Sequence, residues 1–394
     1  MKIVKGWTLG GFAFAGFMLG ACAIQPQASG TQTADMSSQV IVDAAHAGPA
    51  GANVGGIKTY KTIQSALDAA PARSKQPYVV RIKAGRYYEK LEITRPNVTF
   101  IGEGQDKTVL TYDAFSGLDR PGGKAWGTWG CETLIVKAPD FRAESLTIEN
   151  GYDYNANDVL DKSDPKYTNA PQAVALMTDT GSDRAVFYKV KVTGFQDTLF
   201  VNAGRAYFYQ SYVSGHVDFI FGAGQAVFED SDIITRPRLR PDLKTIGYVT
   251  APSTKIADPY GLVFINSRLK KENDKVPANS SPLGRPWHPT ASLPDGRYAD
   301  PDAIGASTFI DCWMDDHIAI DGWASMTGTG RAAGTKDTFL PDNPKHARFL
   351  EHGSKGPGAP RKDASKMRDQ LTGSAEQAKA FTAAKVFGDW APQI

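Results

Sequence analysis

Cysteine is scarce in this sequence, with only Cys22, Cys131 and Cys312 among its 394 residues. No spacing among these cysteines and the six histidines fits a zinc site, so we expect no metal and no other cofactor. The sequence also lacks a Gly-x-Ser-x-Gly segment, which argues against the serine-nucleophile elbow found in many hydrolases. Because sequence gives no distances, Cys131 and Cys312 can form a disulfide or remain two free buried thiols.

The sequence has no apolar run long enough for a comfortable membrane span. Lys2 and Lys5 precede an uncharged, largely apolar stretch, which predicts a signal peptide over residues 1–21. This stretch ends in Leu-Gly-Ala-Cys and resembles the lipobox of bacterial lipoproteins. The alternative is an ordinary signal peptide followed by a chance cysteine. The resemblance implies a lipid on Cys22 and, because Ala23 follows, sorting to the outer membrane of a bacterium.

A net charge of one sign is also absent. Removal of residues 1–21 leaves 42 basic and 42 acidic residues. The mature chain therefore has no net field to attract nucleic acid or anionic lipid, and only the lipid would hold it at a membrane. Residues 22–50 are small, polar and poorly patterned, which predicts a tether between the lipidated cysteine and a domain over residues 51–394. We expect this domain to be a monomer.

Long helical patterns are rare, whereas glycine (39) and proline (24) are plentiful. Residues 59–71 have apolar side chains at helical spacing and predict a short amphipathic helix, and residues 373–390 predict a second helix near the C-terminus. From residue 78 onward, short runs rich in Val, Ile, Tyr and Phe are stopped by Gly, Pro or Asn-Gly. This composition predicts an all-β domain built from many short strands.

Three of these runs form an internal repeat. AVFYKVKVTGFQD begins at Ala185, AYFYQSYVSGHVD begins at Ala206, and AVFEDSDIITR begins at Ala226. A period near twenty residues predicts a parallel β-solenoid, in which each coil buries its inner face against its neighbours. The alternative is a β-sandwich of meander hairpins, but the two-residue Asn-Gly turns that such hairpins favour are scarce here.

The repeat gives two aspartates equivalent positions on adjacent coils. Asp197 lies in a polar Gln-Asp-Thr turn, and Asp218 lies in the apolar run Val-Asp-Phe-Ile-Phe. Stacked strands are about 4.8 Å apart, so one carboxyl is pushed toward the acid form unless a cation keeps it charged. The pattern predicts a general acid beside a nucleophile. Strict alternation also puts Phe219 and Phe221 on the face opposite Ile220.

Five segments, in order, carry a resemblance to a known family. They are Gly85-Arg-Tyr-Tyr-Glu89, Gln172-Ala-Val-Ala-Leu176, Gln196-Asp-Thr-Leu199, Asp218-Phe-Ile-Phe-Gly222 and Leu283-Gly-Arg-Pro-Trp287. Residues 50–392 resemble the pectinesterases (pectin methylesterases), particularly the bacterial members, and the lipobox adds a likeness to outer-membrane lipoprotein pectinesterases. The resemblance implies a right-handed parallel β-helix that hydrolyses galacturonate methyl esters in pectin or its oligomers and releases methanol.

The resemblance also implies a role for each matching side chain. Asp218 would attack the ester carbonyl, Asp197 would donate and then accept a proton, and Arg285 would orient Asp218. Gln196 and Gln172 would donate amide hydrogen bonds to the oxyanion. The residues expected along the substrate cleft are Trp287, Thr128, Val217, Phe221 and Met314.

Three matching positions call for a separate reading. Tyr87 and Glu89 have no obvious route to the ester, so we expect both to serve the structure. Phe200 stands where the family often has tyrosine, which removes a hydroxyl that could bind sugar.

Two other function classes remain open. A polygalacturonase or a calcium-dependent lyase would share the β-helix, and a pair of carboxylates alone does not exclude a glycosidase. The sequence shows no cluster of acidic calcium ligands for a lyase. A non-catalytic glycan-binding lipoprotein would be expected to lack one of the polar site residues, yet all are present. The expected partner is methyl-esterified polygalacturonate or oligogalacturonides, and not nucleic acid.

Overall fold

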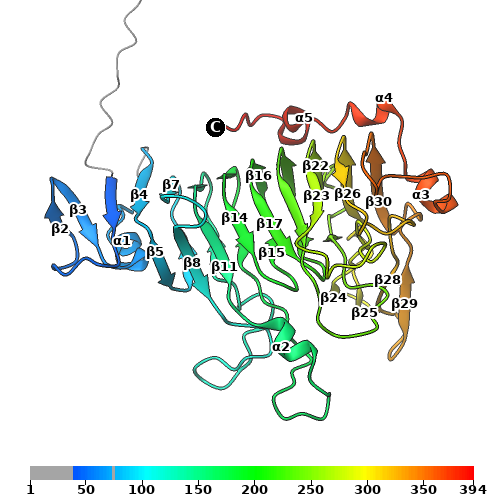
Figure 1. Ribbon diagram of the computed structural model, residues 1–394, viewed down its shortest axis with the longest axis horizontal. Helices are drawn as coiled ribbons and strands as arrows, with labels where there is room; N and C mark the ends of the chain where they lie inside the picture. Colours follow the sequence, from blue (N-terminus) through cyan, green and yellow to red (C-terminus); the bar gives the residue numbers. More distant parts are fainter. Residues whose placement is uncertain (1–38, 73–75) are drawn as a thin grey trace, which may run out of the picture. The chain divides into compact units, whose positions relative to one another are not determined.

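The computed structural model describes residues 39–72 and 76–394 (Figure 1). Most of their strands stack in three parallel sheets, here called sheets A, B and C. The chain passes from a strand of sheet A to one of sheet B, then to one of sheet C in most coils, and returns to sheet A. Each circuit is one coil of a parallel β-helix, as the repeat predicts.

Sheets B and C are made only of parallel neighbours, and sheet A begins with one antiparallel pair, β2 and β3. Sheet A contains β1 (Gln39–Val42), β2 (Ala52–Val54), β3 (Ile57–Tyr60), β4 (Tyr78–Ile82), β7 (Val98–Ile101), β10 (Arg142–Glu144), β13 (Ala185–Tyr188), β16 (Arg205–Tyr209), β19 (Gln225–Glu229), β22 (Leu262–Ile265), β26 (Gly305–Ile310) and β30 (Ala347–His352). Sheet B contains β5 (Gly85–Tyr88), β8 (Thr108–Tyr112), β11 (Thr147–Asn150), β14 (Lys191–Thr193), β17 (Tyr212–Gly215), β20 (Asp232–Thr235), β23 (Arg268–Lys271) and β27 (Trp313–Met314). Sheet C contains β6 (Leu91–Ile93), β9 (Leu134–Val136), β12 (Leu176–Thr178), β15 (Leu199–Val201), β18 (Ile220–Gly222) and β21 (Thr250–Pro252).

Short hairpins and helices surround this stack. The hairpins pair β24 (Thr290–Leu293) with β25 (Gly296–Ala299), and β28 (Met326–Thr329) with β29 (Lys336–Phe339). The helices are α1 (Ile63–Asp68), α2 (Tyr154–Asp158), α3 (Lys366–Gln370), α4 (Ala375–Ala378) and α5 (Ala383–Phe387). Within the described ranges, no helix is long and apolar enough to cross a membrane.

The strand register confirms the repeat. Ala185 pairs with Ala206, and Ala206 pairs with Ala226. Inside the coils, this register stacks like residues on like residues, most clearly in a ladder of phenylalanines on sheet A. Their ring centroids are 4.4–4.7 Å apart, and the ladder consists of Phe187, Phe208, Phe228, Phe264 and Phe309. Stacked rings of this kind bury a large apolar area on every rung.

The predicted helices and tether need three corrections. The tether predicted over residues 22–50 is too long, because β1 pairs with β4 and buries Val40 and Val42. The first helix is shorter than predicted, since Thr62 caps α1 while Thr59 and Tyr60 belong to β3. The predicted C-terminal helix is two short helices, because Thr382 caps α5 after α4 has ended. Cys22, the predicted lipidation site, lies outside the described residues.

Tyr87 and Glu89 serve the structure, as predicted. The hydroxyl of Tyr87 is buried and donates to the Lys83 carbonyl at 3.1 Å. The carboxylate of Glu89 accepts hydrogen bonds from the backbone N–H groups of Ile63 and Gln64, at 2.9 and 2.8 Å. These two groups begin α1 and have no partner within the helix, so Glu89 caps it from the neighbouring coil.

Candidate active site

Asp197 and Asp218 occupy the same position on adjacent coils. Each lies in the connection from sheet B to sheet C, two residues before a strand whose pairing joins Leu199 to Ile220. Both have a left-handed backbone, with φ of 60° and 49°. The backbone N–H of Asp197 donates to the Val217 carbonyl at 3.0 Å, which ties the two turns together. The structure therefore brings together the two aspartates that the repeat predicts to be neighbours.

Arg285 binds Asp218 with both arms of its guanidinium. Nε donates to Oδ1 at 2.9 Å, and Nη2 donates to Oδ2 at 2.6 Å. The side chains of Arg285 and Asp218 are only 20% and 10% exposed, and the guanidinium lies 3.9 Å from the centre of the Tyr248 ring. Burial disfavours the charged form of Arg285, but the charge and hydrogen bonds of Asp218 outweigh burial and raise the pKa of Arg285. A bidentate pair with so little water fixes the Asp218 carboxylate in one orientation.

The surroundings of Asp197 favour the protonated, neutral form of its carboxyl group. Burial of its carboxyl and, second, the neighbouring charge of Asp218 raise its pKa well above the usual aspartate value. Arg285 and a hydrogen bond from the Gln196 side chain act in the other direction and do not cancel this effect. The site thus combines a carboxylate held by arginine with a neighbouring carboxyl group whose pKa is raised, the arrangement required for a nucleophile and an acid.

The two predicted oxyanion donors also lie on adjacent coils. The backbone N–H of Ala173 donates to the Gln196 carbonyl at 3.2 Å, so Gln172 and Gln196 begin neighbouring rungs. The Oε1 atom of Gln172 is buried and has no hydrogen-bond partner within the described part of the chain. This oxygen can accept a hydrogen bond from a ligand, whereas an oxyanion would require the N–H groups of the amide.

Aromatic rings cover the outer face of sheet C next to the aspartates. Phe200 stacks on Phe221 with a centroid distance of 4.1 Å, and Trp287 lies 5.7 Å from Phe221. Trp129 contacts this pair from another loop, 5.2 Å from Phe200 and 6.1 Å from Trp287, and is 54% exposed. We call Trp129, Phe200, Phe221 and Trp287 the aromatic wall. Phe200 and Phe221 are themselves buried, so Trp129 and the partly buried Trp287 offer the flat apolar surfaces on which sugar rings can stack.

Trp129 was missed by the sequence reasoning, which selected its neighbour Thr128. The repeated Trp-Gly pattern of residues 126–130 is the signal that could have identified it. The Thr128 carbonyl is 3.7 Å from Cys131 Sγ, and the cleft role of its side chain stays a prediction. Val217 contributes its peptide group, whose carbonyl bonds the turn of Asp197.

The prediction that Met314 lines the cleft is wrong. Met314 is completely buried in the main core, and its Sδ lies 3.8 Å from Nη2 of Arg368. Its position on β27 turns it inward, where it aligns with Leu269. Another methionine, Met326, lines a hollow of about 180 Å³ together with Trp287. Cys131 and Cys312 are both buried and free.

His216 is a second residue that the sequence reasoning missed. Its Nδ1 accepts a 2.8 Å hydrogen bond from the N–H of Val217, whose carbonyl binds Asp197. The ring is fully buried and meets Tyr154 edge-on at 4.4 Å. Burial, followed by the charges of Arg238 and Arg236, lowers its pKa well below the usual histidine value. A neutral imidazole therefore supports the turn that carries Asp218. The signal was a histidine placed directly before Val-Asp-Phe-Ile-Phe.

Comparison with known proteins identifies the family. A family model described as pectinesterase matches residues 52–389. The chain belongs to the pectinesterase family. It is 44% identical over 340 residues to pectinesterase A of Dickeya chrysanthemi, covering 86% of this chain and 89% of that relative.

Solved structures agree with this assignment. A pectin methylesterase from Yersinia enterocolitica has a TM-score of 0.79 and 46% identity, covering 84% of this chain and all of its own. A pectin methylesterase crystallised with hexasaccharide VII has a TM-score of 0.82 and 42% identity, covering 90% and 98%. The protein is a carboxylic ester hydrolase that acts on pectin methyl esters, and it has the right-handed parallel β-helix of its family. These findings confirm the predicted fold class and reaction.

Proposed function

We propose that this pectinesterase uses Asp218 as its nucleophile and Asp197 as its proton donor. The Asp218 carboxylate attacks the methyl-ester carbonyl of a galacturonate unit, and the resulting tetrahedral intermediate expels methanol as Asp197 gives up its proton. A mixed anhydride between Asp218 and the sugar remains. Asp197, now ionised, removes a proton from water, and the water oxygen attacks the sugar carbonyl and frees Asp218. The observation that carries this proposal is the bidentate Arg285–Asp218 pair beside a carboxyl whose pKa is raised.

The amides of Gln172 and Gln196 would stabilise the oxyanion in both steps. Both residues begin rungs next to the acid pair, and each amide has two N–H groups that can donate. Amide N–H groups donate without a titratable proton. A preorganised donor of this kind lowers the barrier by about 3–4 kcal/mol.

Methyl-esterified oligogalacturonides or the polymer would be the substrate. The related enzyme with 42% identity was crystallised with a hexasaccharide, which supports a chain of several sugars in the cleft. Trp129 and Trp287 of the aromatic wall supply stacking surfaces beside the aspartates, where an uncharged ester is easier to desolvate than a free carboxylate.

Methanol release tests this assignment against the other β-helix activities. We expect wild type to release methanol from methyl-esterified pectin and oligogalacturonides of graded length, with no new reducing ends and no unsaturated products. Asp218→Ala and Asp197→Ala should each lower the rate by about 10³-fold or more. Asp140→Ala is the matched control, because Asp140 is another left-handed aspartate bound by an arginine. Full activity in both site variants would refute the mechanism.

We also propose that the enzyme is a monomer anchored to the bacterial outer membrane by a lipid on Cys22. The lipobox-like sequence over residues 19–22 supports the anchor. Growth with an alkyne-bearing palmitate analogue should label the wild-type chain and not Cys22→Ser. Membrane fractions should contain the labelled wild-type chain. Labelling of the Cys22→Ser variant would refute this lipidation site. Light scattering of the soluble domain tests the monomer.

A further inference from the structure

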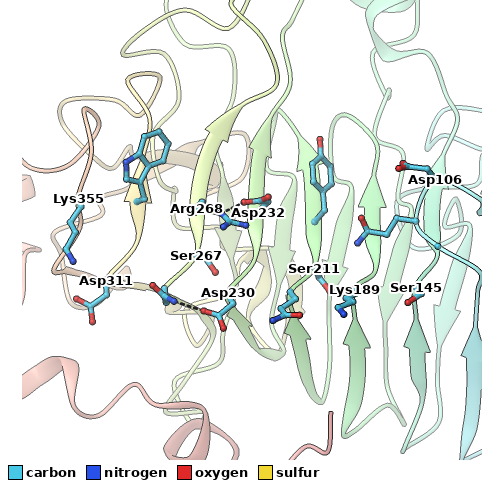
Figure 2. A pocket seen from close by; sticks show the side chains of 16 residues that line it. Asp106, Ser145, Lys189, Ser211, Asp230, Asp232, Ser267, Arg268, Asp311 and Lys355 are labelled. Atoms are coloured by element: carbon cyan, nitrogen blue, oxygen red, sulfur yellow. Dashed lines mark hydrogen bonds and ion pairs between the residues drawn. The ribbon is translucent and has the colours of Figure 1, made fainter.

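A second hollow lies on the β-helix at the junction between sheets A and B. It is a groove of about 990 Å³ (Figure 2). None of its lining residues belongs to the acid pair or the aromatic wall. Within a coil, this junction comes before the connection that carries Asp197 or Asp218. We call it the A/B groove.

Each successive coil contributes one polar residue with a left-handed backbone to the A/B groove. Their φ angles are 48–53°, and they are Ser145, Lys189, Gln210, Asp230, Asn266 and Asp311. The residue that follows is often a buried serine: the hydroxyl of Ser211 donates to the Phe187 carbonyl at 3.0 Å, and that of Ser267 donates to the Phe228 carbonyl at 3.1 Å. The hydroxyl groups of these serines therefore supply hydrogen bonds to the backbone from inside the coil. Lys189 and Gln210 are unusual choices for a left-handed residue, and the turn itself does not require their side chains.

Two aromatic side chains stand along the sheet B side of the A/B groove. The register links Tyr212 to Asp232, Asp232 to Arg268, and Arg268 to Trp313, so all four lie in one outward row. Tyr212 and Trp313 are three rungs apart, which is about 14 Å at the spacing of stacked strands. Trp313 is 38% exposed. Aromatic rings at intervals, separated by hydrogen-bonding groups, suit a sugar chain that runs along the stack.

The charges of the A/B groove nearly cancel. Three cationic residues, Lys189, Arg268 and Lys355, face four carboxylates, Asp106, Asp230, Asp232 and Asp311. Arg268 donates to Asp232 at 2.6 Å, and Asn266 donates to Asp230 at 2.5 Å, as the dashed lines in Figure 2 show. A groove without a positive field does not attract a polyanion such as fully de-esterified galacturonan. Its chemistry fits an uncharged chain of hydroxyl and ester groups.

We propose that the A/B groove binds uncharged, methyl-esterified stretches of galacturonan at a distance from the acid pair. This proposal rests on the proposed function, because the reaction converts each uncharged ester into a carboxylate. Tyr212 and Trp313 stack against sugar rings, while Gln210 and Asn266 hydrogen-bond hydroxyl and ester oxygens. The groove therefore retains unreacted polymer, and it releases a stretch once that stretch carries negative charge.

Affinity electrophoresis tests the groove without relying on turnover. The Asp218→Ala protein and the same protein with Tyr212→Ala and Trp313→Ala are run through gels that contain highly methyl-esterified galacturonan, polygalacturonate or galactan. We expect the added pair of substitutions to weaken retardation by methyl-esterified galacturonan about tenfold. Tyr88→Ala is the matched control, since Tyr88 is a 60% exposed aromatic of sheet B outside the groove. Thermal unfolding checks that every variant folds, and Tyr212→Phe with Trp313→Phe should keep most of the binding.

Three results would overturn the proposal. They are unchanged retardation by methyl-esterified galacturonan, loss of binding to polygalacturonate alone, and an equal or larger loss on galactan. Kinetics with otherwise wild-type protein separate this question from the reaction. Tyr212→Ala with Trp313→Ala should leave methanol release from short oligomers within twofold and raise the KM for long polymer. A wild type that releases no methanol would refute the proposed function, whereas the gel result would still decide what the groove binds.

Discussion

Two arginine–aspartate pairs in this protein have the same local geometry and different surroundings. In both pairs the arginine Nε donates to Oδ1 of the aspartate and Nη2 donates to Oδ2. These distances are 2.9 and 2.6 Å for Arg285 and Asp218, and 2.7 and 2.8 Å for Arg184 and Asp140. Both aspartates have a left-handed backbone. In the second pair, however, the two side chains are 36% and 37% exposed, about twice to four times the exposure of Arg285 and Asp218.

The comparison shows that an ion pair alone does not make an active site. Asp218 has a second carboxyl group beside it, and the pKa of that Asp197 carboxyl is raised by burial and by the Asp218 charge. It also has the aromatic wall and the Gln172 amide close by. Asp140 lies instead near Asp183, whose pKa is lowered because its bonds to Arg205 outweigh burial. The chemistry therefore needs a neighbouring carboxyl group with a raised pKa in addition to the arginine pair.

The largest contrast should appear when each arginine is removed. Arg285→Ala leaves Asp218 buried without its partner, and we expect the rate of methanol release to fall by about 10³-fold or more. Arg184→Ala should change the rate by less than about twofold, because it removes a partly exposed pair. Initial rates on methyl-esterified pectin measure both. Equal losses in the two variants would remove the distinction between the pairs.

A third pair separates stability from catalysis. Arg368 and Glu351 are each only 1% exposed and lie 3.0 Å apart, far along the chain from the acid pair. Glu351→Gln leaves a buried guanidinium without its counter-charge, so we expect a loss of about 3 kcal/mol in the free energy of unfolding. Activity per folded molecule should stay within about twofold. Denaturant titration measures the free energy of unfolding, and rates normalised to the amount of folded enzyme measure the activity. An unchanged free energy of unfolding would contradict the role given to this pair.

The raised pKa of Asp197 predicts a dependence of stability on pH. The folded state retains a proton that the unfolded chain releases above about pH 4, so wild-type stability falls as the pH rises from there through the folded pKa. Asp197→Asn has no such proton to lose. The difference in Tm between the variant and wild type should therefore grow in favour of the variant from pH 4 to pH 7. A difference that is constant over this range would show that the Asp197 pKa is ordinary.

The smallest effect concerns the aromatic wall. Trp129→Ala removes an exposed stacking surface without touching the acids, so we expect KM to rise about fivefold and kcat to stay within twofold. Tyr88→Ala is the control, because Tyr88 is equally exposed and lies on sheet B. Steady-state methanol release on oligogalacturonide methyl esters measures both constants. A lower kcat with unchanged KM would assign Trp129 to the reacting centre.

The sequence could predict the coil register and the acid pair because both follow from a repeat of about twenty residues. It could not separate Met314 from Met326, since both lie on short strands and only the packing turns Met314 into the core. Alternation also failed around Asp218: the side chains of Phe219 and Ile220 both pack in the main core, and Phe221 belongs to the aromatic wall. The left-handed backbone of Asp218 changes the direction in which the next side chains point.

The contacts of His216 and Trp129 likewise depend on distant segments. Tyr154 meets His216 across more than sixty positions of the chain, and Trp287 meets Trp129 from a different loop. No periodic pattern within either segment carries this information. The motif residues could be predicted, whereas the residues that support them required the packed coils.

Infrared difference spectroscopy of the carboxyl groups is the most direct test of the central claim. With ¹³C-labelled aspartate at neutral pH, wild type should show a protonated carboxyl band that disappears in Asp197→Asn and persists in Asp140→Asn. Such a result would mean that Asp197 holds a proton beside an ionised Asp218. A wild-type spectrum without that band, or a band that survives in Asp197→Asn, would contradict the account.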